Sequence, residues 1–309
     1  MKFYAINLLP NKTQIAEIHY KNGLAKIENV FEETSLFPLE NNDNLLHGIR
    51  RIGRQINKNA ECYLTLPTNL LTRMDCNATK YLLFDEYNEE QVDIQLKIWI
   101  KQLLENTIPV DLKTNYTASP LIVRQDSKVS ITAAAIQSIY INVLCKAFDE
   151  CGLQLVSIET ANIALTRYID DFDKTKCIIE LDNVISLTGY DAKLGMFYQP
   201  QPNMPIESII NANDGTNLAT LISAFDIAAA SSYEGNYNPD ECDIYISTKN
   251  NRFSDKLEKF PELKARLKPM PLSNNDVFIP NSLEFNNTGI IQLTTIFGTA
   301  LKPKYEEEK

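Results

Sequence analysis

The sequence predicts an α/β protein made of two halves that begin with the same order of strands. Residues 2–33 contain three strand-like runs, which the turns Pro10-Asn11-Lys12 and Lys21-Asn22-Gly23 separate. Residues 176–200, KCIIELDNVISLTGYDAKLGMFYQP, repeat this order of strand, turn, strand, turn and strand. Helical patterns and further strands follow in both halves. A duplicated architecture is therefore expected, with its boundary near Asp170–Thr175.

The composition argues for a globular protein that works away from nucleic acid and lipid. The chain has 309 residues, of which 44% are hydrophobic and 23% charged, and its formal net charge is −10. This charge argues against a broad nucleic-acid-binding face and against adhesion to anionic lipid. No uncharged run is long enough for a comfortable membrane span, and the N-terminus lacks the features of a secretory signal. We therefore expect a cytoplasmic protein without a direct membrane span.

The cysteines and histidines form no metal-binding or nucleophilic pattern. The six cysteines include no Cys-x-x-Cys pair, and the two histidines, His19 and His47, do not have the spacing of metal ligands. Most thiols stand in apolar surroundings, so we expect reduced core residues at Cys62, Cys76, Cys145, Cys151, Cys177 and Cys242. No hydrolase or metalloprotease motif occurs either. The sequence therefore predicts no metal and no catalytic residue.

The elements of the first half follow from hydrophobic periodicity. Residues 24–33 are the third strand of the meander, Asn44–Lys58 is an amphipathic helix, and residues 60–67 are a buried strand. The strongest helical pattern, Asn88–Asn106, includes Trp99. The half then continues with strands at 114–123 and 128–136, a helix at Gln137–Glu150 closed by Gly152, a strand at 153–160 and a helix at about Ala161–Ile169.

The second half is expected to continue after its meander with helices and one clear strand. A long helical stretch covers about Gly215–Tyr233, and residues 242–248, CDIYIST, form a strand. A helix lies within Phe253–Leu267, and the apolar residues 288–302, TGIIQLTTIFGTALK, form the last segment.

Several stretches resemble the actin-like fold, and within it the PilM-type assembly proteins of type IV pili. AINLLPNKTQIAEI at 5–18 resembles the family's first strand, phosphate loop and second strand. YLTLPTNLLTRMD at 63–75 and EEQVDIQLKIWIKQLLENTIPVDL at 89–112 resemble the entry to an inserted subdomain and its helix. The most specific stretch, VSITAAAIQSIYINVLCKAFDECGLQLVSIETANIALTRYI at 129–169, follows the family's connection between lobes. IFGTALK at 296–302 resembles the terminal helix.

The resemblance implies a duplicated, ribonuclease H-like fold with two lobes and an FtsA-like inserted subdomain. Residues 1–170 would form the first lobe, with the insertion at about 70–130, and residues 171–302 the second lobe. Residues 303–309 would be a flexible tail. The same resemblance extends to the cytoplasmic domain of type II secretion L-type subunits. On that alternative, the chain is the cytoplasmic part of a longer membrane protein whose apolar helix lies beyond residue 309.

The family's nucleotide loops correspond to altered positions in this chain. Asn7 takes the place of the first loop's Asp, Leu9 replaces its Gly, and Pro10 has no N–H to offer a phosphate. Glu180 stands where the resemblance expects Asp in the second loop. Residues 246–251, at the adenosine loop, contain no glycine. We interpret these loops as ordinary turns of a fold that no longer binds nucleotide, and we expect no cofactor.

A second interpretation keeps weak ATP·Mg²⁺ binding, as in an active actin-like ATPase. The polar residues that the resemblance places at the loops would carry it: Asn7, Asn11, Gln14, Glu159, Glu180 and Asp182. That enzyme would need phosphate contacts and a carboxylate that positions the metal.

The letters Ile-Asn-Leu-Leu-Pro at residues 6–10 match the cytoplasmic peptide of PilN, the membrane partner in pilus systems that this chain resembles. A PilN-like chain would continue with basic residues and a membrane helix, whereas here a sheet pattern comes next. Leu8 and Leu9 are therefore expected as buried strand residues.

The resemblance implies a non-catalytic scaffold that binds the N-terminal peptide of a PilN-like inner-membrane protein and links it to the motor ATPase side of the apparatus. The peptide groove would lie at about residues 70–130, with Trp99 as a candidate anchor.

Overall fold

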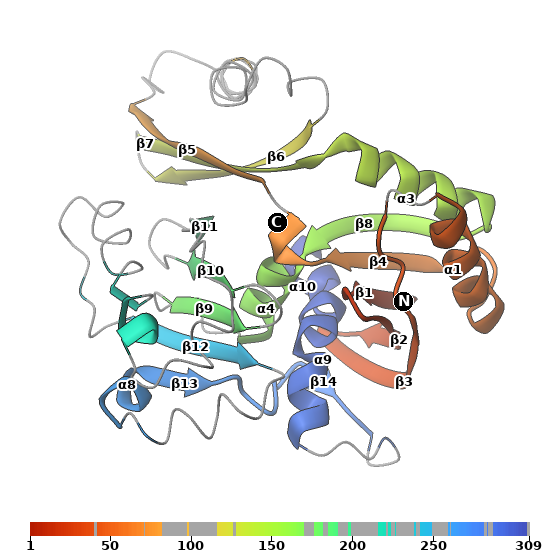
Figure 1. Cartoon of the computed structure of the whole chain (residues 1–309). Coiled ribbons are helices and arrows are strands. Elements are labelled where there is room, and N and C mark those ends of the chain that lie inside the picture. The colour runs from red at the N-terminus through yellow and green to blue at the C-terminus, as the bar shows by residue number, and fades with distance from the viewer. Residues whose placement is uncertain are drawn as a thin grey trace.

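A computed structural model gives the architecture of the chain. It describes residues 1–39, 42–70, 72–81, 98, 116–125, 128–169, 176–181, 185–190, 197–198, 216–220, 222–223, 226, 238, 242–248, 259, 261–280, 283 and 287–307. Three separate sheets organise these residues (Figure 1).

The largest sheet has six strands in the order β14-β3-β2-β1-β4-β8. Their bounds are β1 (Lys2–Leu8), β2 (Lys12–Lys21), β3 (Leu24–Thr34), β4 (Glu61–Leu66), β8 (Gln154–Thr160) and β14 (Val277–Phe278). β1, β2 and β3 form an antiparallel meander, while β4 and β8 extend it as parallel strands. We call this sheet and its helices the first lobe.

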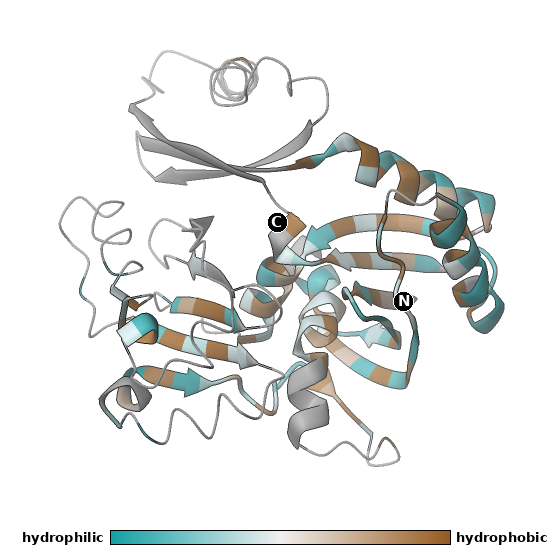
Figure 2. Ribbon diagram, in the orientation of Figure 1, coloured by the Kyte–Doolittle hydropathy of each residue, from teal (hydrophilic) through white to brown (hydrophobic). Residues whose placement is uncertain are grey.

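Helices cover both faces of this sheet, which explains why β1 is apolar almost throughout. On one face lie α1 (Asn42–Gln55) and α3 (Ser138–Glu150) with the core around Ile6, Ile15 and Leu64. On the other lie α4 (Ala161–Ile169) and α9 (Asn287–Ala300) with the core around Phe3, Ala16 and Phe297. Figure 2 shows hydrophobic residues interspersed with more polar ones along these strands.

The second lobe is a five-stranded sheet in the order β11-β10-β9-β12-β13. Its strands are β9 (Lys176–Leu181), β10 (Ile185–Tyr190), β11 (Phe197–Tyr198), β12 (Asp243–Thr248) and β13 (Leu267–Pro269), with α8 (Pro261–Arg266) before β13. Its order matches that of the first lobe: an antiparallel meander of three strands extended by two parallel strands. The predicted duplication is confirmed.

A third sheet, of three strands in the order β5-β7-β6, stands apart from the lobes beside α3 (Figure 1). Its strands β5 (Thr72–Tyr81), β6 (Tyr116–Gln125) and β7 (Lys128–Gln137) follow β4 and the short helix η1 (Thr68–Leu70) in the chain and lead into α3. The predicted helix Asn88–Asn106, with Trp99, lies outside the described residues except for Ile98, which is helical and exposed.

Several differences from the sequence prediction have simple causes. The helix predicted within Phe253–Leu267 is confirmed as α8, which ends at Arg266 because Leu267 pairs with Ile244 in the sheet. The short strands β13 and β14 contain too few residues to show a hydrophobic periodicity, so the sequence does not predict them. Residues 303–307, expected in the flexible tail at 303–309, belong to α10 (Lys302–Glu307). Cys145, expected in the core, is exposed, whereas Cys62, Cys177 and Cys242 are buried, reduced cysteines.

Within the described part of the chain, no helix is both long and apolar enough to cross a membrane. The boundary predicted at Asp170–Thr175 falls outside the described residues, so the domain limits stay a prediction.

Candidate functional site

Five polar residues form one continuous row across the first lobe's sheet, near the carboxyl ends of β1, β4 and β8. Cross-strand pairing joins them in the order Glu32, Gln14, Asn7, Thr65 and Glu159, and we call this set the polar row. Asn7 lies two and four residues after Ala5 and Phe3, which face the α9 side of the sheet. The polar row therefore faces the helices that connect the two lobes.

Amide side chains link the first part of the polar row. Asn7 Nδ2 donates to Gln14 Oε1 at 3.2 Å, and Gln14 Nε2 donates to Glu32 Oε1 at 3.2 Å. Lys12 pairs with the same Glu32 oxygen. Asn7 is 1% exposed, and its Oδ1 has no hydrogen-bond partner in the described structure.

Thr65 links the middle of the polar row to α9 through a hydrogen bond. Its hydroxyl lies 2.6 Å from the hydroxyl of Thr299, which in turn donates to the carbonyl of Thr295 at 2.9 Å. Because the Thr299 proton is used in that bond, Thr65 is the donor between the two hydroxyls. The helix thus occupies the space above the row.

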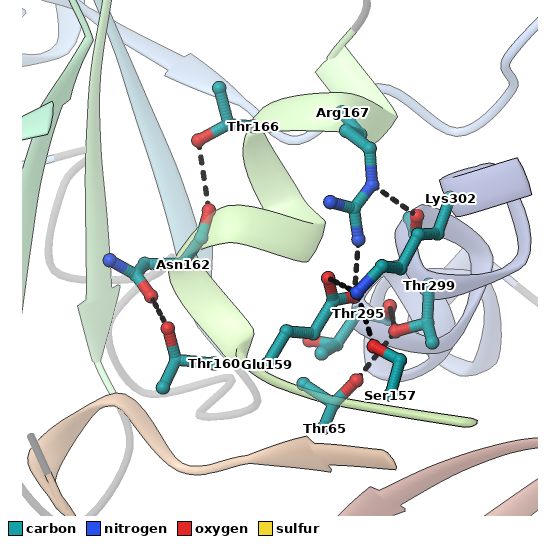
Figure 3. A network of polar contacts seen from close by, with 11 residues as sticks. Thr65, Ser157, Glu159, Thr160, Asn162, Thr166, Arg167, Thr295, Thr299 and Lys302 are labelled. Atoms are coloured by element: carbon teal, nitrogen blue, oxygen red, sulfur yellow. Dashed lines mark hydrogen bonds and ion pairs between the residues drawn. The ribbon is translucent and has the colours of Figure 1, made fainter. Parts of the chain in front are cut away.

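Glu159 ends the row in a buried ion cluster (Figure 3). One carboxylate oxygen pairs with Arg167 of α4, and the other lies 3.6 Å from Lys302 Nζ. Arg167 Nε also donates to the Gly298 carbonyl at 3.0 Å, and Lys302 donates to the Ser157 hydroxyl. This carboxylate is neutralised by cations of the chain itself, so its charge is not available to an external cation.

The cluster sits where α4 and α9 cross at very short distance. A Cβ atom on Gly298 would lie 1.8 Å from the Ala164 carbonyl oxygen. Only glycine therefore permits this approach, which in turn brings Arg167 to the Gly298 carbonyl.

A second polar contact joins the two lobes directly. Thr68 Oγ1 donates to Glu180 Oε2 of β9 at 2.7 Å and accepts from the Asn162 backbone N–H at 3.1 Å. One threonine thus bridges η1, α4 and the second lobe's first strand.

The turn between β1 and β2 is closed by its own backbone. Leu9 N–H donates to the Lys12 carbonyl at 2.9 Å, and Leu9 is buried at 7% exposure. Pro10 and Asn11 are exposed at the tip. Because Pro10 has no N–H and that of Leu9 is used, these two residues give a phosphate no backbone donor.

The structure brings some of the predicted site residues together and separates others. Asn7, Gln14 and Glu159 share the polar row, and Glu180 reaches the first lobe through Thr68. Asn11 is exposed at the tip of the turn between β1 and β2. Asp182 and Trp99 lie outside the described residues. The described residues contain no group of His, Cys, Asp and Glu that could hold a metal ion.

Sequence reasoning missed four contributors to the site, namely Thr65, Thr68, Arg167 and Lys302. Arg167 carried a usable signal, because it is the only charged residue of α4 and a charge within an apolar helix requires a partner. The threonines gave none, since threonine is common in strands and turns.

No protein-family model matches the chain, and no curated protein matches its sequence. Among solved structures, the PilM-PilN type IV pilus biogenesis complex is similar, with a TM-score of 0.68 and 11% identity over 98% of this chain and 98% of that chain. This similarity shows the fold, so the predicted actin-like architecture of PilM-type proteins is confirmed.

Two further solved structures align at lower similarity. The cytoplasmic domain of EpsL, an inner membrane component of the type II secretion system of Vibrio cholerae, has a TM-score of 0.43 and 6% identity over 96% of both chains. Inorganic polyphosphate/ATP-glucomannokinase from Arthrobacter sp. strain KM has a TM-score of 0.42 and 9% identity over 97% of this chain and 99% of that chain.

Proposed function

We propose that this protein is a non-catalytic cytoplasmic scaffold of a type IV pilus or type II secretion-like machine. It would bind the short N-terminal peptide of a PilN-like inner-membrane protein and stay at the membrane through that partner. The observation that carries the proposal is a shared fold over 98% of both chains with a structure described as a PilM-PilN complex. Linking this partner to the assembly motor ATPase is part of the same proposal.

The polar contacts of the candidate site support a role without catalysis. An ATPase of this architecture needs backbone donors for phosphates and a carboxylate that holds Mg²⁺ through water. Here Leu9 N–H is used within its own turn, Arg167 and Lys302 neutralise Glu159, and Thr68 binds Glu180. The alternative, an active actin-like ATPase, would have to break these contacts.

Exposed apolar side chains on α3 and β8 support a peptide-binding role. That sheet contacts α3 through β6 and β7, and β8 lies at the end of the six-stranded order. Ile139 of α3 is 52% exposed and Val156 of β8 is 49% exposed. An apolar peptide of the Ile-Asn-Leu-Leu-Pro kind would bury both.

The test is a titration of the whole protein with a synthetic peptide that begins with Ile-Asn-Leu-Leu-Pro, beside a scrambled peptide. We expect saturable binding of the first peptide only, weakened about tenfold or more by Ile139→Asp or Val156→Asp. Leu272→Asp, which changes another exposed apolar residue, is the matched control. Calorimetry with ATP and Mg²⁺ should give no binding heat at about 1 mM nucleotide. Tight ATP binding would favour the enzyme, and equal binding of both peptides would contradict the scaffold.

A further inference from the structure

Helix α1 has one apolar face and one basic face. Its apolar side chains are buried in the core of the first lobe. The opposite face and the turn after it are exposed, and their basic side chains are His47, Arg50, Arg54 and Lys58. We call these four residues the basic face of α1. The helix lies on the side of the first lobe away from the second lobe, so this face points outward from the molecule (Figure 1).

Three members of the basic face are cations that the chain itself does not neutralise. Among the residues that the structure describes, no carboxylate forms an ion pair with Arg50, Arg54 or Lys58. Arg50 lies beside the thiol of Cys151 at the end of α3. Arg50 and Arg54 are four residues apart, so they follow each other along the helix at about 6 Å.

Carboxylates on the elements around α1 are paired with other cations. The pairs are Glu33 with Arg51, Glu150 with Lys146 and Glu17 with Lys2, at 3.3, 3.8 and 2.5 Å. Each pair is neutral as a whole, so none of them cancels the charge of the basic face.

Two other carboxylates near the ends of these elements point away from the basic face. Cys151 packs beside Gly53 of α1, so Asp149, two residues earlier on α3, lies on the far side of that helix. Glu61 precedes Cys62, which packs in the core on the α1 side of the sheet. The side chain of Glu61 therefore points to the other face of the sheet.

The ends of the helices offset only part of the positive charge. α1 and α3 both end beside the basic face, and each C-terminus carries about half a negative charge. Asp43, in the first turn of α1, lies about 16 Å from Arg54 along the helix. This separation exceeds the screening length of about 8 Å in physiological salt. A local positive charge therefore remains, in a chain whose net charge is −10.

We propose that the basic face of α1 binds an acidic helical segment of a partner protein, with carboxylates at every fourth residue. This spacing places the carboxylates about 6 Å apart, the same interval as between Arg50 and Arg54. Arginine suits such a contact because its planar guanidinium can donate two parallel hydrogen bonds to a carboxylate. Ile139 lies at the opposite end of α3 from Cys151, so this face adds a second partner to the proposed scaffold.

A protein segment fits the basic face better than a membrane or a nucleic acid. A bilayer is broad, so it would also meet the strongly negative remainder of the chain and be repelled by it. Nucleic acids are bound through many phosphate contacts, whereas only three unpaired cations lie here. A single helix is narrow enough to contact α1 alone.

The test measures the binding of fluorescein-labelled peptides to the full chain by fluorescence anisotropy. The first peptide repeats Glu-Ala-Ala-Gln four times, the second has the same composition with its glutamates in one block, and the third has lysine in place of glutamate. We expect the first peptide to bind, the second to bind about fivefold more weakly and the third not to bind. The affinity of the first peptide should fall as salt is added.

Charge reversal on the basic face should weaken this binding. We expect Arg54→Glu and Lys58→Glu each to lower the affinity for the first peptide about fivefold, because each replaces an attraction by a repulsion. Lys21→Glu makes the same change at an exposed lysine at the end of β2 and should leave the affinity unchanged. Circular dichroism of each variant separates lost binding from lost folding.

Four results would overturn the proposal. They are no binding of the first peptide, equal binding of the first and second peptides, equal effects of Lys58→Glu and Lys21→Glu, and binding of phosphatidylglycerol vesicles that Lys58→Glu abolishes. The last result would identify lipid as the occupant. The apolar peptide proposed for α3 and β8 is tested with variants of Ile139 and Val156, so the two proposals can fail independently.

Discussion

Glu159 is the single residue that most limits what can lie between the lobes. A buried carboxylate is stable when paired, and Arg167 and Lys302 supply two cations to it. The polar atom left over nearby is Asn7 Oδ1, which finds no partner among the described residues. One unpaired amide oxygen suits a water molecule far better than a nucleotide with its metal.

Tyr168 gives a second residue whose chemistry can be measured. It is 1% exposed, and no partner for its hydroxyl occurs in the described parts of the chain. Burial raises the pKa of Tyr168 from 10.0 to about 12. The unfolded chain therefore loses this proton at lower pH than the folded protein does, so the stability that Tyr168 contributes falls as pH rises through this window.

We expect Tyr168→Phe to raise the free energy of unfolding by about 1 kcal/mol at pH 7, since it removes a buried hydroxyl without a partner. The gain should grow by about 1 kcal/mol between pH 8 and pH 10.5, because the variant lacks the group that ionises on unfolding. Urea unfolding of the wild type and the variant at pH 7, pH 8 and pH 10.5 measures these differences in the free energy of unfolding. Tyr4→Phe is the control at pH 7, since the Tyr4 hydroxyl donates to Glu17. A variant less stable than the wild type at pH 7 would refute the argument.

At the scale of elements, the crossing of α4 and α9 determines the site more than any strand does. The two helices meet at Ala164 and Gly298, and their approach places Arg167 against both Glu159 and the α9 backbone. The resemblance included the stretch 296–302 that contains Gly298, but only the structure shows the backbone atom that forbids a side chain at this residue.

We expect Gly298→Ala to destabilise the protein by about 3 kcal/mol, because the added methyl group would overlap the Ala164 carbonyl. Thermal and urea unfolding measure the loss. Gly53→Ala in α1 is the matched control: its Cβ would meet nothing nearer than 3.8 Å, and alanine favours a helix by up to about 1 kcal/mol. Equal stabilities of the two variants would show that the crossing can relax.

The sequence predicted the elements that have a strong hydrophobic periodicity. It missed those that depend on strand pairing between residues far apart in the chain. Helix 161–169, the strands of both meanders and the turns at Gly23 and Gly152 agree with the structure, since local apolar spacing and positive φ define them. β14 exists only because Val277 and Phe278 meet β3, about 250 residues earlier in the chain. The polar row was equally hidden, because its register joins five strands that no local pattern aligns.

On the scale of the whole molecule, the proposal of a scaffold without catalysis depends on the contacts where the two lobes meet. α4 leads from the first lobe to the second, α9 packs back against the first sheet, and Thr68 bonds to Glu180 between them. On the proposed function, the altered loops and these contacts act together, so changing one loop alone should not create nucleotide binding.

This argument predicts the behaviour of the double variant Leu9→Gly/Pro10→Ser, which restores small residues to the first turn. We expect a loss of about 2–4 kcal/mol of stability, because Leu9 is buried, and no binding of ATP·Mg²⁺ by calorimetry. Pro10→Ser alone is the control, since Pro10 is exposed and its replacement should change stability little. Glu159 would still be neutralised by Arg167 and Lys302, and Glu180 would still accept from Thr68. Saturable ATP heat in the double variant, absent from the control, would show that the turn alone keeps nucleotide out and would return the enzyme to consideration.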